Sequence, residues 1–144
     1  MTDINKGAFN GMTSLKSIHL QNNLIRIVKE EDFQDLPDLI YLYLNFNQID
    51  YLHPNAFSSL KKLAYLYLDH NQITSLPETV FHGCPSLFSL DLSFNGVNLV
   101  YPATFEKSQR LRHINFATNE IKSLDENLFK DVPKVASLDF RSIF

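Results

Sequence analysis

The sequence predicts an α/β solenoid, a coil of short repeats with a parallel sheet on its concave side and an irregular, short-helical convex side. Three observations predict this fold. The pattern LxxLxLxxNxI recurs every 24 residues, an asparagine returns at its ninth position, and a phenylalanine returns in the second half of each unit. One unit cannot bury its own apolar edge, so neighbouring units must stack around a shared core.

The register of this pattern divides a single domain, residues 1–144, into repeats. We expect a half repeat at 1–14, full repeats at 15–38, 39–62, 63–86, 87–110 and 111–134, and a partial repeat at 135–144. The full repeats begin with LKSIHLQNNLI, LIYLYLNFNQI, LAYLYLDHNQI, LFSLDLSFNGV and LRHINFATNEI. No linker, low-complexity stretch or second domain interrupts them.

The first half of each unit predicts a short strand. Its leucines alternate with other side chains, and at a period of two they all point to one side, into the core. The asparagines stand where the strand must turn, and a short amide side chain can bond the backbone of adjacent turns there. These asparagines are Asn23, Asn47, Asn71, Asn95 and Asn119.

The second half of each unit predicts the thicker convex side. A column of phenylalanines should fill it: Phe9, Phe33, Phe57, Phe81, Phe105 and Phe129. Pro37, Pro85 and Pro133 close this half, because proline ends a helical turn. Cys84 occupies an otherwise mainly apolar column, and a free cysteine behaves as a small hydrophobe, so we expect it to be buried.

These motifs resemble the 24-residue class of the leucine-rich repeat family over essentially the whole chain. The resemblance implies a horseshoe segment. The stretch SLDLSFN at residues 89–95 is similar to the ectodomains of Toll-like receptors, Slit-type guidance proteins and related adhesion proteins. It implies a non-enzymatic protein-recognition module of a receptor, adhesion or innate-immunity type, located outside the cell or at its surface. In that family the concave face or a flank usually binds another protein.

Large aromatic residues stand at the outward positions of two neighbouring units. Tyr41, Tyr43, Tyr65 and Tyr67 should form a quartet, since adjacent strands lie about 4.8 Å apart, and Phe88 extends it at the rim. The rings could serve only to stabilise the sheet by packing across strands. We favour anchoring of a protein or peptide partner, because tyrosine is enriched at interfaces and four exposed rings form an apolar patch.

Charged residues lie beside this quartet. Asp69, Asp91 and Asp139 tilt the face toward negative charge, which either serves solubility or favours a partner with Lys or Arg. His113 lies diagonally from Asp91, and we expect a surface ion pair between them when the histidine is protonated. The candidate partner-binding residues are therefore Tyr41, Tyr43, Tyr65, Tyr67, Asp69, Phe88, Asp91 and His113.

The aromatic residues before the asparagines form a separate column. Phe46, His70 and Phe94 occupy position eight of three consecutive units. We expect these side chains to stack on one another at the edge of the solenoid rather than to contact a ligand.

Composition argues against several other functions. A net charge of −3 and a pI near 5.9 do not fit a nucleic-acid-binding protein. No stretch approaches the roughly 20 apolar residues of a membrane span, so we expect no membrane insertion. Catalytic and zinc-binding groups do not cluster along the repeats, and no glycine-rich phosphate loop occurs, so we expect no enzyme and no cofactor.

The chain departs in two respects from the extracellular members of the family that it resembles. It has one cysteine, hence no cysteine-rich caps, and no Asn-x-Ser/Thr glycosylation site. A fragment of a larger ectodomain is the first explanation, and an uncapped cytoplasmic regulatory subunit is the second. A third alternative is a structural element that self-associates through open terminal strands at 15–20 and 135–140, because unpaired strand edges favour pairing with another copy.

Overall fold

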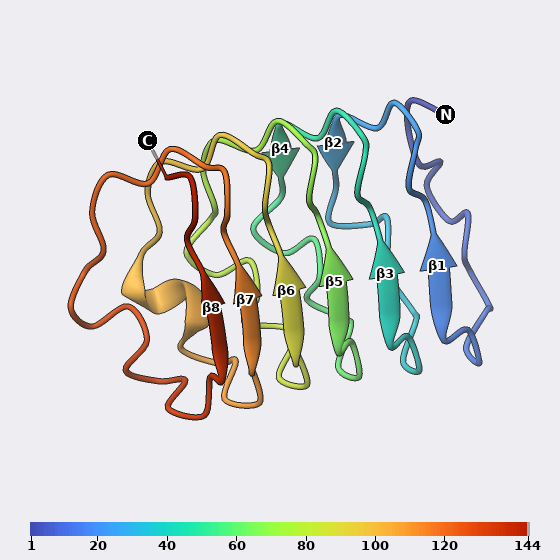
Figure 1. Ribbon diagram of the computed structural model, residues 1–144. Coiled ribbons are helices and arrows are strands. Elements are labelled where there is room, and N and C mark those ends of the chain that lie inside the picture. Colours follow the sequence, from blue (N-terminus) through green and yellow to red (C-terminus); the bar gives the residue numbers. More distant parts are fainter. Residues whose placement is uncertain (144) are drawn as a thin grey trace.

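A parallel sheet of six short strands runs the length of the molecule in the computed structural model, which describes residues 1–143. Figure 1 shows the strands side by side, with the two termini at opposite ends of the row. In order they are β1 (Ser17–His19), β3 (Tyr41–Tyr43), β5 (Tyr65–Tyr67), β6 (Ser89–Asp91), β7 (His113–Asn115) and β8 (Ser137–Asp139). The predicted solenoid with a parallel sheet is therefore confirmed.

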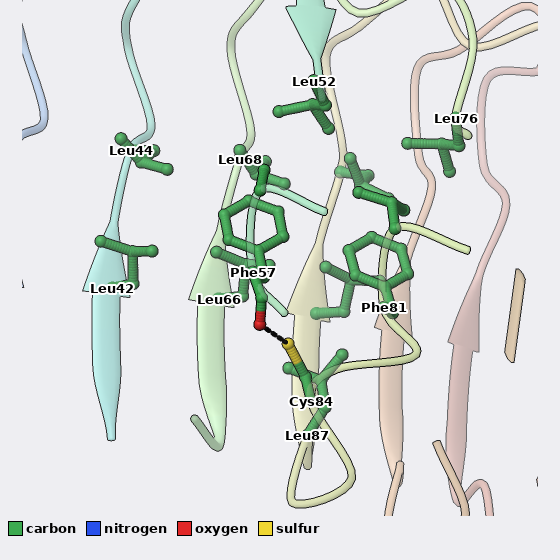
Figure 2. Packing of buried hydrophobic residues seen from close by; sticks show 14 of the residues in the cluster. Leu42, Leu44, Leu52, Phe57, Leu66, Leu68, Leu76, Phe81, Cys84 and Leu87 are labelled. Carbon is green, nitrogen blue, oxygen red and sulfur yellow. Dashed lines mark hydrogen bonds between the residues drawn. The ribbon is translucent and has the colours of Figure 1, made fainter. Parts of the chain in front are cut away.

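The register of the sheet reproduces the sequence period. Ser17 pairs with Tyr41, Tyr41 with Tyr65, and Tyr65 with Ser89, each 24 residues further along the chain. Every column of the sequence pattern thus becomes a row of neighbouring side chains that crosses the strands. The strand leucines form the inner rows. In the middle strands they are completely buried, as Leu42 and Leu66 illustrate (Figure 2), whereas Leu138 in the terminal strand β8 is exposed.

The convex side consists mainly of turns. A second parallel sheet contains only two residues per strand, β2 (Ile27–Val28) and β4 (Tyr51–Leu52). The short-helical element expected there is a single 3₁₀ helix, η1 (Pro102–Phe105), which starts on a proline as helices favour. No other helix occurs within residues 1–143.

The phenylalanine column forms a continuous stack inside the convex half. Successive ring centroids, from Phe9 to Phe129, lie 6.1, 6.3, 6.4, 6.3 and 6.1 Å apart. The middle rings are fully buried, and Figure 2 shows Phe57 and Phe81 between the leucines of adjacent turns. Each ring therefore packs on the units before and after it, which couples neighbouring repeats.

The asparagine column forms a second connection between repeats. The Asn47 amide donates to the carbonyl oxygens of Leu20 (2.9 Å) and Leu44 (3.0 Å), one in the preceding unit and one in its own. Its Oδ1 accepts the backbone N–H of Ile25, again in the preceding unit, at 3.1 Å. Asn71, Asn95 and Asn119 repeat this arrangement one unit further on each time.

Cys84 is buried, as predicted. Its Sγ–H donates to the carbonyl oxygen of Phe57 in the preceding unit, with an S···O distance of 3.4 Å (Figure 2). Burial raises the pKa of the thiol to about 12. The sulfur is therefore a protonated packing group at neutral pH, since a thiolate is the reactive form of cysteine.

Gly83, beside this cysteine, packs directly against the backbone of Ser58 in the preceding unit. A Cβ at position 83 would lie 2.3 Å from the Cα of Ser58 and 2.7 Å from its carbonyl oxygen. We expect Gly83→Ala to lower the free energy of unfolding by about 2 kcal/mol, because backbone atoms cannot move aside without separating the units. Urea denaturation followed by circular dichroism would measure the loss.

Gly96 provides the matched control for this substitution. A Cβ there would meet Thr74 at 3.4 Å and the Ile73 carbonyl at 3.7 Å, which are ordinary contacts. Gly96→Ala should change stability by less than about 1 kcal/mol. Equal losses for the two variants would show that close packing is not the reason for glycine at position 83.

Candidate functional site

The outward side of the six-stranded sheet carries two rows of aromatic side chains. We call this side the open face. The first row runs Tyr41, Tyr65, Phe88 and His113, with ring centroids 4.9, 5.9 and 5.4 Å apart. The second row runs His19, Tyr43 and Tyr67, with centroids 4.4 and 4.9 Å apart. The predicted quartet therefore exists as two stacked pairs, each extended by neighbouring rings.

Stacking follows directly from the parallel register. Tyr41 is opposite Tyr65, and Tyr43 is opposite Tyr67, so each ring meets an equivalent ring on the next strand. The ring planes are inclined by only 13° and 7°, respectively. His19 joins the second row in the same way, although the sequence analysis did not include it among the site residues. Its place in the same column as Tyr43 and Tyr67 is the signal that identifies it.

Stacking covers the ring faces but leaves their outer edges available. Tyr41 is the most exposed of the four at 37%, and Tyr43, Tyr65 and Tyr67 are half-buried. The expectation of four exposed rings is thus met fully only by Tyr41. Within residues 1–143 none of the four phenol hydroxyls has a hydrogen-bond partner.

A polar hollow lies next to the tyrosine rows, on β6, β7 and β8. It has a volume of about 160 Å³, and its wall includes Tyr67, Asp91, His113, Asn115 and Asp139. The Asp91 carboxylate accepts hydrogen bonds from the Ser93 hydroxyl (2.7 Å) and the Asn115 amide (3.1 Å). The open face therefore combines an aromatic part with a polar, acidic part.

Two groups at this boundary have shifted protonation equilibria. Burial raises the pKa of the Tyr67 phenol, and the nearby Tyr43 and Asp91 act in the same direction. Burial also raises the pKa of the Asp69 carboxyl, against a hydrogen bond with His70 that lowers it. Tyr67 thus remains a neutral phenol that can donate a hydrogen bond.

The expected ion pair between His113 and Asp91 does not form. Among the described residues no nitrogen of His113 lies within 4.0 Å of an Asp91 oxygen. Asp91 is already held by Ser93 and Asn115, and the His113 ring turns its edge to Phe88 at an interplanar angle of 62°. The aromatic contact and the competing hydrogen bonds therefore replace the diagonal pair.

The position-eight column lies just beyond the strands and stacks as predicted. The His70 ring is sandwiched between Phe46 and Phe94, with centroids 4.1 and 4.2 Å away. All three residues have positive φ angles, 55°, 54° and 53°, which bulky side chains rarely adopt. The asparagine bonds that follow hold this conformation. His70 Nδ1 also lies 2.8 Å from the Asp69 carboxylate.

The described residues contain neither a metal-binding cluster nor a membrane-spanning helix. Residues 1–143 contain no group of three or more His, Cys, Asp or Glu side chains placed to hold a metal ion. Over the same range, none of the helical segments has the length and apolar character needed to cross a bilayer.

The fold and the open face define a parallel repeat solenoid, and comparison with known proteins identifies its family. The Leucine rich repeat family model matches residues 1–49 and 41–97, which is more than half of the chain. The chain therefore belongs to the leucine-rich repeat family. No curated protein matches the chain significantly.

A solved structure has the same fold. It is a chain of the octameric complex of Latrophilin 3 (Lec, Olf), Unc5D (Ig, Ig2, TSP1) and FLRT2 (LRR), with a TM-score of 0.79 and 21% sequence identity. The match covers 88% of this chain and 39% of that chain, so this chain spans less than half the length of its structural relative. At this identity the likeness concerns the fold alone.

Proposed function

We propose that this chain is a non-enzymatic protein-recognition module that binds a protein or peptide on its open face. Leucine-rich repeats are typically protein-binding scaffolds, and the solved relative with this fold belongs to an assembly of several proteins. The observation that carries the proposal is the pair of aromatic rows with unpaired hydroxyls. A location outside the cell or at its surface is part of the proposal, based on the resemblance to receptor and adhesion ectodomains.

The rows suit an interface for a physical reason. Stacking fixes Tyr43 against both His19 and Tyr67, so little side-chain freedom remains to be lost on binding. Each ring still offers an apolar edge and a hydroxyl to a partner, which is the combination that makes tyrosine frequent at interfaces. Cross-strand stacking and partner binding are thus compatible roles for the same side chains.

The acidic part of the open face determines the charge that a partner should carry. Asp69 and Asp91 lie beside Tyr67. Burial is the main cause of the raised pKa values of Tyr67 and Asp69, and the negative charge of Asp91 raises both further. We propose that the partner places Lys or Arg at this end of the tyrosine rows. Complementary charge of this kind mainly improves association rate and specificity.

The double substitution Tyr43→Ala/Tyr67→Ala tests the proposed binding face. Random dodecapeptides displayed on phage would be selected on the wild-type chain, and the enriched peptides would be synthesised and titrated. We expect the double variant to bind them at least about tenfold more weakly, because truncation of interface tyrosines commonly costs over 1 kcal/mol each. Thermal unfolding should remain cooperative, since both rings lie outside the buried core.

Phe46→Ala/Phe94→Ala is the matched control. It removes the same number of aromatic rings from the position-eight stack, which lies beyond the strands. Binding of the enriched peptides should change less than about twofold. If the peptides bind the tyrosine variant as tightly as the wild type, the open face is not the recognition surface.

A further inference from the structure

A hollow at the beginning of β5 and β6 lies next to the first aromatic row and is lined by two cations. Its volume is about 360 Å³, and its wall consists of Ile40, Lys62, Ala64, Tyr65, Ser86, Phe88 and Arg110. Tyr65 and Phe88 contact each other with centroids 5.9 Å apart. The hollow is therefore part aromatic and part cationic.

The repeat register explains why the hollow exists. Lys62, Ser86 and Arg110 occupy the same position in three consecutive units, directly before the first leucine of the repeat. The middle residue is short, and Ala64 is also short beside Phe88. Two long basic side chains thus flank a space that neither fills, with their backbones about 10 Å apart at the usual strand spacing.

The two cations differ in how far they are already neutralised. Lys62 Nζ is paired with the Asp38 carboxylate at 2.6 Å. Arg110 is exposed, and within residues 1–143 no carboxylate lies within 4.0 Å of its guanidinium. A guanidinium presents several donors in a planar fork that matches a carboxylate. Arg110 therefore has unused capacity to bind an anion at the hollow.

The charges around the hollow also favour a negatively charged ligand. The three residues before each strand of the six-stranded sheet include five cations and a single carboxylate. They are Lys16, Lys62, Arg110, Arg112 and Lys134, with Asp38 as the acid. The opposite ends of the strands carry Asp69, Asp91 and Asp139, of which Asp139 is paired with Arg141 at 2.7 Å. The open face is thus basic where its strands begin and acidic where they end.

From this arrangement we infer that the hollow is a binding subsite for an acidic side chain of a protein or peptide partner. The carboxylate of an Asp or Glu would lie between Arg110 and Lys62, and an apolar neighbour of that residue would pack on Tyr65 and Phe88. A peptide that crosses the open face along the strands would then have its acidic residue at this end and its basic residue near Asp69 and Asp91. This inference rests on the proposed recognition function and specifies one part of the partner.

A protein partner fits better than a sulfated polysaccharide. A polyanionic chain needs a continuous row of cations. Here Ser86 interrupts the row between Lys62 and Arg110, and Asp38 stands next to Lys62 at the end of the row. Ile40, Tyr65 and Phe88 give the wall an apolar part, which binds apolar groups that a sulfated polysaccharide lacks. The hollow is also the size of one or two side chains rather than an extended groove.

Synthetic peptide pools of fixed central residue provide the probe. Three pools of nine-residue peptides would carry Glu, Gln or Lys at the centre and mixed residues elsewhere, and binding to the immobilised chain would be measured at physiological salt, where long-range attraction is screened. We expect the Glu pool to bind with about fivefold higher affinity than the Gln pool. The Lys pool should compete least well for this subsite, because its central charge is repelled by the two cations. Equal binding of the Glu and Gln pools, including no binding of either, would overturn the inference.

Two double variants of identical net charge test the position of the subsite. Lys62→Glu/Arg110→Glu should abolish the preference for Glu over Gln. Lys61→Glu/Lys134→Glu changes the charge equally at exposed lysines that do not line the hollow, and it should keep the preference. Loss of the preference in both variants would mean diffuse electrostatic attraction, which contradicts a defined subsite.

Two further measurements separate this inference from its alternatives. A polysaccharide site would be indicated instead if heparin oligosaccharides bound the wild type more tightly than the Glu pool does, and if that binding were weakened by the Lys61→Glu/Lys134→Glu variant. Tyr43→Ala/Tyr67→Ala separates the subsite from the open-face proposal. If the Glu preference depends on Lys62 and Arg110 but peptide binding does not depend on the tyrosines, the subsite is supported and the role of the tyrosine rows in binding is refuted. If binding depends on the tyrosines but the Glu preference does not depend on Lys62 and Arg110, only the subsite is refuted.

Discussion

Asn47→Ala is expected to lower the free energy of unfolding by about 4 kcal/mol, because the buried Ile25 N–H loses its partner and the Leu20 and Leu44 carbonyls each lose one of their two amide donors. The side chain is 8% exposed and joins two units through the Leu20 and Leu44 carbonyls and the Ile25 N–H. Water cannot replace these bonds without opening the turn. The positive φ of Phe46, directly before Asn47, would also lose the bonds that hold it. Urea denaturation followed by circular dichroism would measure the change.

Asn23→Ala is the control within the same column. The Asn23 amide donates only to the carbonyls of Leu20 and Gln21 in its own turn, and its Oδ1 meets the amino group of Met1. Asn23 has no strand before it to bond, unlike Asn47. Its substitution should therefore lower the free energy of unfolding by only about 1 kcal/mol. If both variants were equally destabilised, the bonds between units would not be the source of the effect.

Phe57→Ala should cost about 4 kcal/mol, which is typical for truncating a buried phenylalanine. Its ring is completely buried and lies 6.3 Å from Phe33 and 6.4 Å from Phe81, in the middle of the stack. Removal would leave a cavity that spans two unit boundaries. In repeat proteins a weakened boundary can separate the unfolding of the two sides, so we also expect a broader transition. Circular dichroism during thermal unfolding would detect both effects.

Phe57→Leu separates loss of volume from loss of the ring. Leucine keeps most of the apolar volume, so the cost should fall to about 1.5 kcal/mol. The Phe57 carbonyl still accepts the Cys84 Sγ–H in both variants, because that bond involves only backbone at position 57. Equal destabilisation by Ala and Leu would mean that ring stacking, rather than buried volume, stabilises the column.

Several features were predictable because they depend only on the repeat period. The six-stranded parallel sheet, the buried leucines, the phenylalanine stack, the asparagine ladder and the burial of Cys84 all follow from columns at intervals of 24 residues. The stack of Phe46, His70 and Phe94 is of the same kind. Parallel strands pair at a constant spacing, so residues in one column must become neighbours. A repeating sequence therefore determines contacts within each column.

Contacts between different columns depended on the tertiary structure. Phe88 lies between Tyr65 and His113 although it belongs to another column. Asp91 bonds Ser93 of another column, and Asn115 of its own column, rather than His113. The period does not determine which rotamer a side chain adopts or which of several hydrogen bonds wins. The convex side likewise consists of turns, with η1 as the one helix among residues 1–143, because the short segments between the tightly packed columns have no room for longer helices.

The candidate site likewise has features that follow from the repeat period and features that depend on the tertiary structure. The sequence alone determined that Tyr41 and Tyr65, and Tyr43 and Tyr67, lie side by side on the outward face, because their columns and register leave no other arrangement. Only the tertiary structure decided that stacking would half-bury three of the rings and that the short side chains of Ser86 and Ala64 would open a hollow between Lys62 and Arg110. The reason is that periodicity positions backbones, whereas exposure and cavities depend on how side chains of unequal size fill the space between them.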